Sequence, residues 1–205
     1  MKYAIFDIDG TLVDSMPVWN NICIDVLNKY GVSYPDNILD IITPLGMKQG
    51  AKYLIKLGLN LTVDEIIQIE LDYILKQYRE SVPLKKGVKK YLKSLKEDGV
   101  KMCVLTASSH DLIDPCLKRL GIWEYFEYIV SAEDIGVSKS DTRAFEILLE
   151  KLGSVPHETV VFDDNFSALK AAKRAGLKTC GVYDKASEIN TEKIKKMCDM
   201  YIESF

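Results

Sequence analysis

The sequence predicts an α/β fold, a doubly wound parallel sheet that carries an inserted bundle of helices. Short apolar runs rich in β-branched residues alternate with helical patterns along most of the chain, which is typical of parallel strands buried on both faces. Most of these helical patterns stop at a glycine, the residue that most readily adopts the left-handed conformation after a helix. No strand pattern is found from residue 15 to about residue 83, and this gap predicts the insertion.

Each apolar run is bounded by polar or turn residues, as expected of a short strand. The runs that predict strands are 3–8, 101–106, 127–132, 159–164 and 178–183. Between them, apolar residues at helical spacing predict helices at 88–97, 110–120, 142–152 and 166–175. Strand and helix therefore alternate in the order that produces a doubly wound sheet.

The stretch without strands carries only helical patterns, at 18–31, 46–58 and 63–78. Three or four helices in series favour a helical bundle inserted after the first strand. We therefore expect a core domain of residues 1–14 and 84–205 and a helical insert of residues 15–83. The chain would leave the core near residues 14–17 and return through residues 81–87.

Composition excludes several classes of protein. The 205 residues suffice for one large domain or for a domain with an insert, and 47% apolar with 28% charged residues is ordinary for a globular chain. The net charge is −3 and no basic tract is present, so nucleic acid is not an expected partner. No segment approaches the roughly 20 apolar residues that a membrane helix needs, so no membrane partner is expected either.

A cytoplasmic location is expected for two reasons. The first apolar stretch is interrupted at Asp7, too early for the apolar region of a secretory signal. The five cysteines are scattered, with no Cys-x-x-Cys pair, which indicates thiols in a reducing compartment and neither a disulfide framework nor a zinc site. Two isolated histidines make a poor case for a histidine-based catalytic triad.

Two aspartates end the first predicted strand, within the stretch "AIFDIDGTLV" (residues 4–13). Asp7 and Asp9 are one residue apart, so in extended chain their side chains point roughly the same way. Neighbouring carboxylates repel each other, and each is costly to remove from water. A turn at Asp9-Gly10 would explain Asp9 alone, but it does not explain Asp7 inside the apolar run. A bound cation would relieve the repulsion.

A second acidic pair, Asp163 and Asp164, ends the strand predicted at 159–164. Capping of the next helix is the alternative explanation, but a cap needs one acid at most. Strand ends of one parallel sheet meet at the same crevice, so these two acids and the pair Asp7 and Asp9 are expected to converge. Four carboxylates suit a hard, oxygen-binding cation that keeps several waters, which predicts Mg²⁺ as the cofactor.

Two further positions could bind an anion. Thr106 ends a strand just before a helix, where a hydroxyl and backbone N–H groups make an anion site, although such residues usually only cap the helix. Lys139 precedes the helix at 142–152, where a lysine is most often solvated. Beside four acids and an anion site, Lys139 could pair with both Asp7 and a phosphate.

Together these sites resemble the haloacid dehalogenase-like hydrolase superfamily, in its phosphatase branch with a helical cap inserted after the first motif. "DIDGT" resembles the first motif, "VLTAS" the second, Lys139 the third and "FDDN" the fourth, in order along essentially the whole chain. The stretch "DIDGTLVDSMP" and the position of the cap are most similar to the β-phosphoglucomutase and phosphoglycolate phosphatase group. The resemblance implies a Rossmann-like catalytic core.

The resemblance also implies a role for each matching residue. Asp7 would be the nucleophile that forms an aspartyl-phosphate, and Asp9 the general acid and then the base that activates water. Lys139 would steady Asp7 and the phosphoryl group. The substrate's phosphate would be held by Thr106, Ala107 and Ser108, and Gly10 would let the chain turn so that Asp9 faces the site. Mg²⁺ would be held by the Asp7 carboxylate, the Asp9 main-chain carbonyl and Asp164, with Asp163 close by or linked through water.

The chain departs from the family pattern at two places. "KSDTRAF" stands where relatives often carry Lys-Pro-x-Pro, which changes the stiffness of the loop more than the chemistry. Asn165 stands where the fourth motif usually has Ser, which could shift metal or water contacts. Asp9 argues against a dehalogenase, whose chemistry needs neither a second aspartate nor Mg²⁺.

The function predicted is a Mg²⁺-dependent phosphatase acting on a small phosphorylated metabolite, such as a sugar phosphate. The cap would choose the substrate, and Lys48, in the turn at residues 43–50, is equally compatible with substrate contact and with a solvated lysine. A phosphomutase and a non-catalytic binding module are the alternatives. A mutase needs a site for a second phosphate, and a binding module would have been indicated by loss of Asp7 or Asp9. A monomer is expected because cap-bearing relatives are often monomers.

Overall fold

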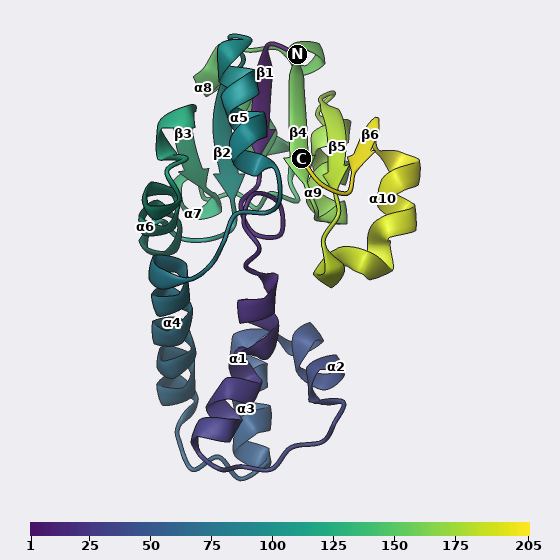
Figure 1. The fold of residues 1–205 in the computed structure, drawn as a ribbon. Coiled ribbons are helices and arrows are strands. Elements are labelled where there is room, and N and C mark those ends of the chain that lie inside the picture. Colours follow the sequence, from purple (N-terminus) through teal and green to yellow (C-terminus); the bar gives the residue numbers. More distant parts are fainter. The chain divides into compact units, whose positions relative to one another are not determined.

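The computed structural model describes residues 1–205, apart from the side chain of Pro44. The chain forms two compact units (Figure 1). The sheet unit consists of Met1–Asp14 and Val82–Phe205, and the helical unit consists of Ser15–Ser81. Among the residues described, no helix is both long enough and apolar enough to cross a bilayer.

A parallel sheet of six strands, in the order β3-β2-β1-β4-β5-β6, forms the centre of the sheet unit. The strands are β1 (Tyr3–Phe6), β2 (Lys101–Thr106), β3 (Phe126–Ser131), β4 (Thr159–Asp163), β5 (Lys178–Val182) and β6 (Met200–Ile202). The predicted doubly wound sheet is therefore confirmed, with the ends of the five predicted strands shifted by at most two residues. The sixth strand, β6, was not predicted because its apolar run is only three residues long.

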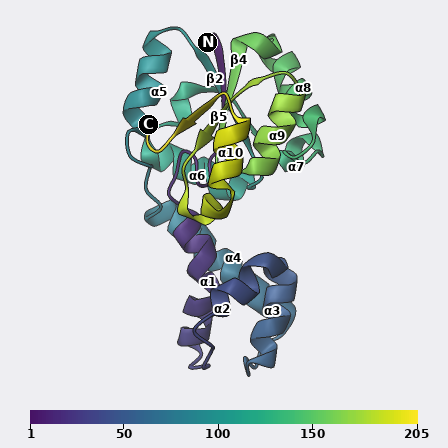
Figure 2. The ribbon, with the colours of Figure 1, turned by 90° about the vertical axis from the view of Figure 1, so that its right-hand side faces the viewer.

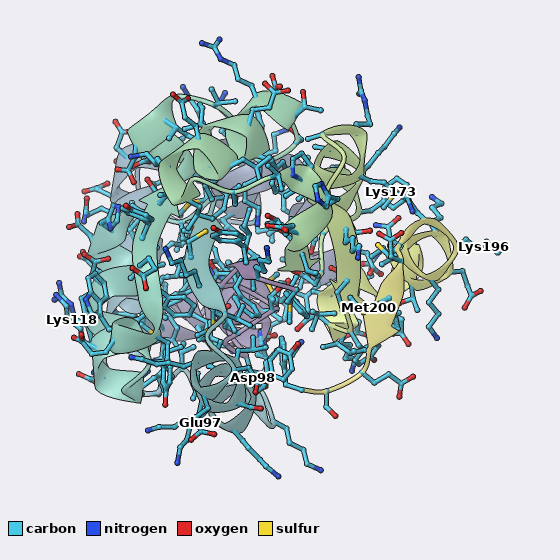
Figure 3. The ribbon with its side chains drawn as sticks, turned by 90° about the horizontal axis from the view of Figure 1, so that it is seen from above. Glu97, Asp98, Lys118, Lys173, Lys196 and Met200 are labelled. Carbon is cyan, nitrogen blue, oxygen red and sulfur yellow. The ribbon has the colours of Figure 1, made fainter. Side chains whose placement is uncertain are left out.

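Helices cover both faces of this sheet. They are α5 (Val88–Glu97), α6 (His110–Leu120), α7 (Ala132–Ile135), α8 (Thr142–Leu152), α9 (Phe166–Arg174) and α10 (Thr191–Met197), with short 3₁₀ turns η2 (Trp123–Tyr125), η3 (Pro156–Glu158) and η4 (Lys185–Asn190). Figure 2 shows α5 on one side of the sheet and α8 and α9 on the other. Viewed from above, the exposed residues Lys118, Lys173 and Lys196 lie at the periphery of the sheet unit (Figure 3).

The central strand β1 is buried on both faces, which explains its continuous apolar run. Ile5 joins the core formed with α8 and α9, which also includes Phe145 and Leu148. Phe6 points to the opposite face and stacks on Phe162, with ring centroids 4.7 Å apart. The backbone N–H of Asp7 then donates to the carbonyl of Phe162 over 2.9 Å. The next side chain after this buried strand is therefore held at the carboxyl edge of the sheet.

The helical unit contains α1 (Met16–Lys29), α2 (Ile38–Ile42), α3 (Gly46–Lys56) and α4 (Val63–Glu80), with the 3₁₀ turn η1 (Thr43–Leu45). Helix α4 begins at a capping box in which Thr62 and Glu65 satisfy each other's backbone N–H groups. Its buried residues recur every fourth position, namely Ile66, Glu70, Ile74 and Tyr78. Three of these are apolar or aromatic, as a core-facing helix requires, and the acidic one is the exception.

Glu70 makes the stability of the protein depend on pH. Burial raises the pKa of this carboxyl from 4.5 to about 7. Below pH 4.5 the group is protonated in the folded and unfolded chains alike. As pH rises from 4.5 to 7, the Glu70 carboxyl ionises in the unfolded chain before it does so in the folded chain, so the free energy of unfolding falls. The total loss is about 3 kcal/mol above pH 7. Between pH 5 and 8, wild-type protein should lose about 2 kcal/mol more free energy of unfolding than Glu70→Gln.

Urea unfolding followed by circular dichroism at several pH values measures this difference. Glu80→Gln, at an exposed position near the end of the same helix, is the matched control and should track the wild type. Parallel pH profiles for Glu70→Gln and the wild type would show that the buried carboxyl does not change its protonation on unfolding.

Candidate active site

Three strand ends meet at the carboxyl edge of the sheet, where open α/β sheets bind their ligands. Strands β2, β1 and β4 are neighbours in that order. Thr106 ends β2, Asp7 follows β1 and Asp163 ends β4. Asp7 and Asp163 occupy neighbouring strand ends although they are 156 residues apart in the sequence, so the parallel pairing brings their side chains together.

An acidic cluster occupies this edge. Asp7, Asp163 and Asp164 each offer a carboxylate oxygen, and these oxygens all lie within 4.8 Å of one another. All three residues are buried, with exposed fractions of 5%, 2% and 6%. Three buried carboxylates so close together suit a hard divalent cation, because oxygen ligands and negative charge are what Mg²⁺ prefers. The donor set therefore fits the predicted magnesium.

Lys139 supplies the positive charge in direct contact with this cluster. Its ammonium pairs with Asp7 Oδ1 and with Asp163 Oδ2, the latter over 2.9 Å, and the side chain is only 11% exposed. Burial disfavours the ammonium form, but the carboxylates of Asp163 and Asp7 outweigh it and raise the pKa of Lys139. The lysine thus remains charged, and one positive charge faces three carboxyl groups.

Two carboxyl groups of the cluster have raised pKa values. Burial raises the pKa of Asp7 well above its usual value, Lys139 opposes the rise, and Asp163 and Asp164 add to it. Burial, reinforced by Asp163, raises the pKa of Asp164 to about 6. A divalent cation at the cluster would favour the ionised carboxylates, which are also the forms that bind metal.

Asp9 lies outside this group of mutually close carboxylates, although its charge still acts on Asp7. Among the described residues, the group of mutually close metal ligands contains Asp7, Asp163 and Asp164 only. Strand β1 ends at Phe6, so Asp7 and Asp9 lie in the segment that follows it. The Asp9 carboxylate instead accepts a hydrogen bond of 2.6 Å from the Ser108 hydroxyl. The metal-binding role of its main-chain carbonyl stays a prediction.

Gly10 forms the turn after Asp9 for two reasons. Its φ of +78° lies in the left-handed region that glycine adopts without strain. A Cβ atom at this position would also lie 2.8 Å from Asp164 Oδ2, too close for any side chain. The glycine that the sequence assigned to a turn therefore also makes room for a carboxylate of the acidic cluster.

The loop after β2 faces the same edge. Thr106 is buried, and its hydroxyl accepts a hydrogen bond of 3.1 Å from the Ser108 backbone N–H. Ser109 precedes α6, but its side chain makes no capping hydrogen bond. Ala107 is exposed between these residues. Small side chains and backbone N–H groups before a helix leave room for an anion.

The capping alternative for Asp163 and Asp164 is wrong. Asn165 caps α9, because its side-chain oxygen accepts hydrogen bonds from the N–H groups of Ser167 and Ala168 over 2.9 and 3.2 Å. Asp163 Oδ1 accepts from the N–H of Asn165 over 2.8 Å and so supports the turn. The asparagine that departs from the family motif serves the helix, which leaves the Asp164 carboxylate to the acidic cluster.

Sequence reasoning missed the residues that support Asp164. The Ser187 hydroxyl donates to Asp164 Oδ2 over 2.6 Å, and the Thr11 hydroxyl lies 3.4 Å from Asp164 Oδ1. Thr11 belongs to "DIDGT", so the motif offered a signal for it. Ser187 lies on a polar turn with no periodic pattern, and no signal was available. Lys48 is exposed in α3 of the helical unit, and its contact with substrate stays a prediction.

Comparison with known proteins agrees with the resemblance to the haloacid dehalogenase-like hydrolases. The family profile described as haloacid dehalogenase-like hydrolase matches residues 4–182. A phosphorylated carbohydrates phosphatase of Thermotoga maritima is 26% identical, over 86% of this chain and 82% of the relative. A pyrophosphatase of Bacillus velezensis is 29% identical, over 87% of this chain and 81% of the relative. The solved structure of a β-phosphoglucomutase-like protein from Thermotoga maritima superposes with a TM-score of 0.85 at 24% identity, covering 98% of this chain and 94% of that one, which shows a common fold.

Proposed function

The chain belongs to the haloacid dehalogenase-like hydrolase family, and from this premise we propose that it is a Mg²⁺-dependent phosphatase of a small phosphorylated metabolite. The observation that carries the proposal is the buried Asp7, which pairs with Lys139 and faces two further carboxyl groups at the end of β1. A sugar phosphate or a similar phosphomonoester is the proposed substrate, and the relative that acts on phosphorylated carbohydrates supports this class.

Asp7 would act as the nucleophile. A carboxylate oxygen of Asp7 bonds to phosphorus while the bond from phosphorus to the leaving oxygen breaks, which produces an aspartyl-phosphate and an alcohol. Splitting the reaction into two steps helps because phosphomonoesters hydrolyse extremely slowly without a catalyst. Lys139 would offset the repulsion between the anionic nucleophile and the anionic phosphoryl group.

Asp9 would move the proton in both steps. It donates its proton to the leaving oxygen in the first step, and in the second it takes a proton from the water that attacks phosphorus. The aspartyl-phosphate then breaks to free Asp7 and inorganic phosphate. The hydrogen bond from Ser108 orients the Asp9 carboxylate for this task. A group that is half-buried and separate from the acidic cluster can exchange protons with substrate and water.

The remaining residues would hold the phosphate and the cation. Thr106, with Ala107 and Ser108 in the loop after β2, would donate hydrogen bonds to the phosphate oxygens, and Lys139 would add charge. Asp7 and Asp164, with Asp163 beside them, would hold Mg²⁺, which when bound supplies positive charge beside the phosphoryl group. The roles of the helical unit and of Lys48 in substrate choice, the monomeric state and the cytoplasmic location stay predictions.

Phosphate release from a panel of phosphorylated metabolites, measured with Mg²⁺ and with excess EDTA, tests the proposal. We expect release from at least one sugar phosphate with Mg²⁺ and loss of nearly all of it with EDTA, since the charge that offsets the buried carboxylates is then removed. Adding back Mg²⁺ in excess is the control for damage by the chelator.

Two other outcomes would contradict a phosphatase. Isomerised sugar phosphates without free phosphate in the same reactions would indicate a phosphomutase, which returns the phosphoryl group to the product. No turnover of any compound by folded protein would leave the non-catalytic binding module as the better description.

A further inference from the structure

We propose that Lys85 and Ser187 are positioning residues that hold the Asp164 carboxylate in place for the divalent cation. The inference rests on the proposed function, because it assumes that the acidic cluster binds Mg²⁺. Neither residue belongs to the acidic cluster, and neither lies in one of the motifs that indicated the site. Their contacts nevertheless form one continuous path to Asp164.

The path begins at Asp164 itself. Both of its carboxylate oxygens have a hydroxyl neighbour, Ser187 at 2.6 Å on Oδ2 and Thr11 at 3.4 Å on Oδ1. The shorter bond is the stronger restraint, and it comes from outside the "DIDGT" turn. A carboxylate that accepts a hydrogen bond on one oxygen is fixed in rotation, while its remaining lone pairs stay available for a cation. Supporting hydrogen bonds of this kind set the orientation of metal ligands.

The position of Ser187 depends on Asp184. The turn η4, which carries Ser187, starts directly after Asp184. Asp184 Oδ1 accepts from the N–H of Ala186 over 2.9 Å, and its carbonyl accepts from the N–H of Ser187 over 3.1 Å. Asp184 is only 6% exposed. A buried carboxylate thus holds the turn that presents the Ser187 hydroxyl.

Lys85 completes the path. Its ammonium donates to the Gly10 carbonyl over 2.7 Å, to Asp184 Oδ2 over 3.0 Å and to the Tyr183 carbonyl. An ammonium has three N–H donors, so all three are used. The side chain is 16% exposed, and its backbone N–H donates to the Leu12 carbonyl over 3.0 Å.

One ammonium therefore joins three segments that surround Asp164. They are the turn after Asp9, the connection from β5 to η4, and the segment by which the chain returns to the sheet unit. Gly10 lies so close to the Asp164 carboxylate that a Cβ atom would not fit, and Ser187 donates a hydrogen bond to the same carboxylate. Removal of Lys85 would leave Asp184 buried without its ammonium partner and release η4 from the Gly10 turn, so the Ser187 hydroxyl would lose its fixed position.

Calorimetric titration with Mg²⁺ alone, without substrate, tests the inference on the full chain. We expect Ser187→Ala and Lys85→Met each to raise the dissociation constant for Mg²⁺ about 10- to 100-fold. Ser187→Thr keeps the hydroxyl and should bind nearly as tightly as the wild type. The double variant should bind no more weakly than the worse single variant, because both residues act on the same carboxylate. Lys86→Met, at the exposed neighbouring position, is the matched control.

Three results would overturn the inference. Ser187→Ala with the affinity of Lys86→Met would show that the hydroxyl does not position Asp164. Lys85→Met with a lower melting temperature but unchanged affinity would assign Lys85 a structural role only. Multiplied effects in the double variant would show that the residues act independently. If Lys85→Met does not fold, Ser187→Ala and Ser187→Thr still decide the matter. Wild-type protein that binds no Mg²⁺ would instead count against the proposed function.

Discussion

Asp7→Asn is expected to lower phosphate release at least about 1,000-fold while the protein stays folded. A carboxamide is a poor nucleophile and cannot form the aspartyl-phosphate, so the two-step route is closed. Folding should tolerate the change, because burial and the neighbouring carboxylates already disfavour the ionised form of Asp7. Lys139 also retains its pair with Asp163. Release of phosphate at saturating Mg²⁺, together with the melting temperature, measures both effects.

Asp14→Asn is the matched control for this variant. Asp14 is exposed and lies at the end of the same N-terminal segment of the sheet unit, so the substitution removes the same charge away from the cluster. We expect wild-type rates from it. An Asp7→Asn protein that retains about a tenth or more of the activity would show that Asp7 is not the nucleophile, and would shift attention to a water-mediated route.

Lys139→Met is expected to lower both stability and activity. The free energy of unfolding without Mg²⁺ should fall by about 3 kcal/mol, because Asp7 and Asp163 would face each other with no ammonium between them. The loss should be smaller at pH 5 than at pH 8, since protonation of Asp7 and Asp164, whose pKa values are raised, relieves the repulsion. Phosphate release should fall about 100-fold or more, because the lysine also offsets charge on the phosphoryl group.

Thermal unfolding at both pH values, with and without Mg²⁺, measures the stability change. Mg²⁺ should stabilise Lys139→Met more than it stabilises the wild type, since the cation would then be the cluster's main source of positive charge. Lys151→Met, at an exposed position on α8, is the control for loss of a lysine charge. A Lys139→Met protein as stable as Lys151→Met would mean that the carboxylates do not depend on this ammonium.

Prediction of the fold succeeded where local sequence and burial agree. The five longer strands each contain a short run of mostly apolar residues, because helices cover both faces of the sheet, so these runs are visible in the sequence. The short strand β6 and the short helix α2 were not predicted individually, since neither is long enough to show a period. Their formation depends on neighbours that are already in place, as with β6, which pairs along β5.

Prediction of the site succeeded for residues at strand ends. Parallel strands bring their carboxyl ends together, so the acids after β1 and β4 could be expected to meet from sequence alone. Asp9 was expected to converge with the other three acids, but it lies outside the group of mutually close carboxylates, while its charge still acts on Asp7. The cap formed by Asn165 is visible only in the hydrogen bonds of the turn, because Asp163 and Asp164 are equally good capping residues.

The sequence by itself determined the five longer strands, that Asp7, Asp163 and Asp164 lie at the ends of buried strands, and the family to which the chain belongs. These features depend on local periodicity and on motifs of a few residues. Only the tertiary structure decided that Lys139 pairs with Asp163 as well as Asp7, and that Ser187 and Lys85 support Asp164. The physical reason is that hydrogen bonds and ion pairs act over about 3 Å in space, whatever the separation along the chain, so the partner of a buried charge becomes visible only once the chain has folded.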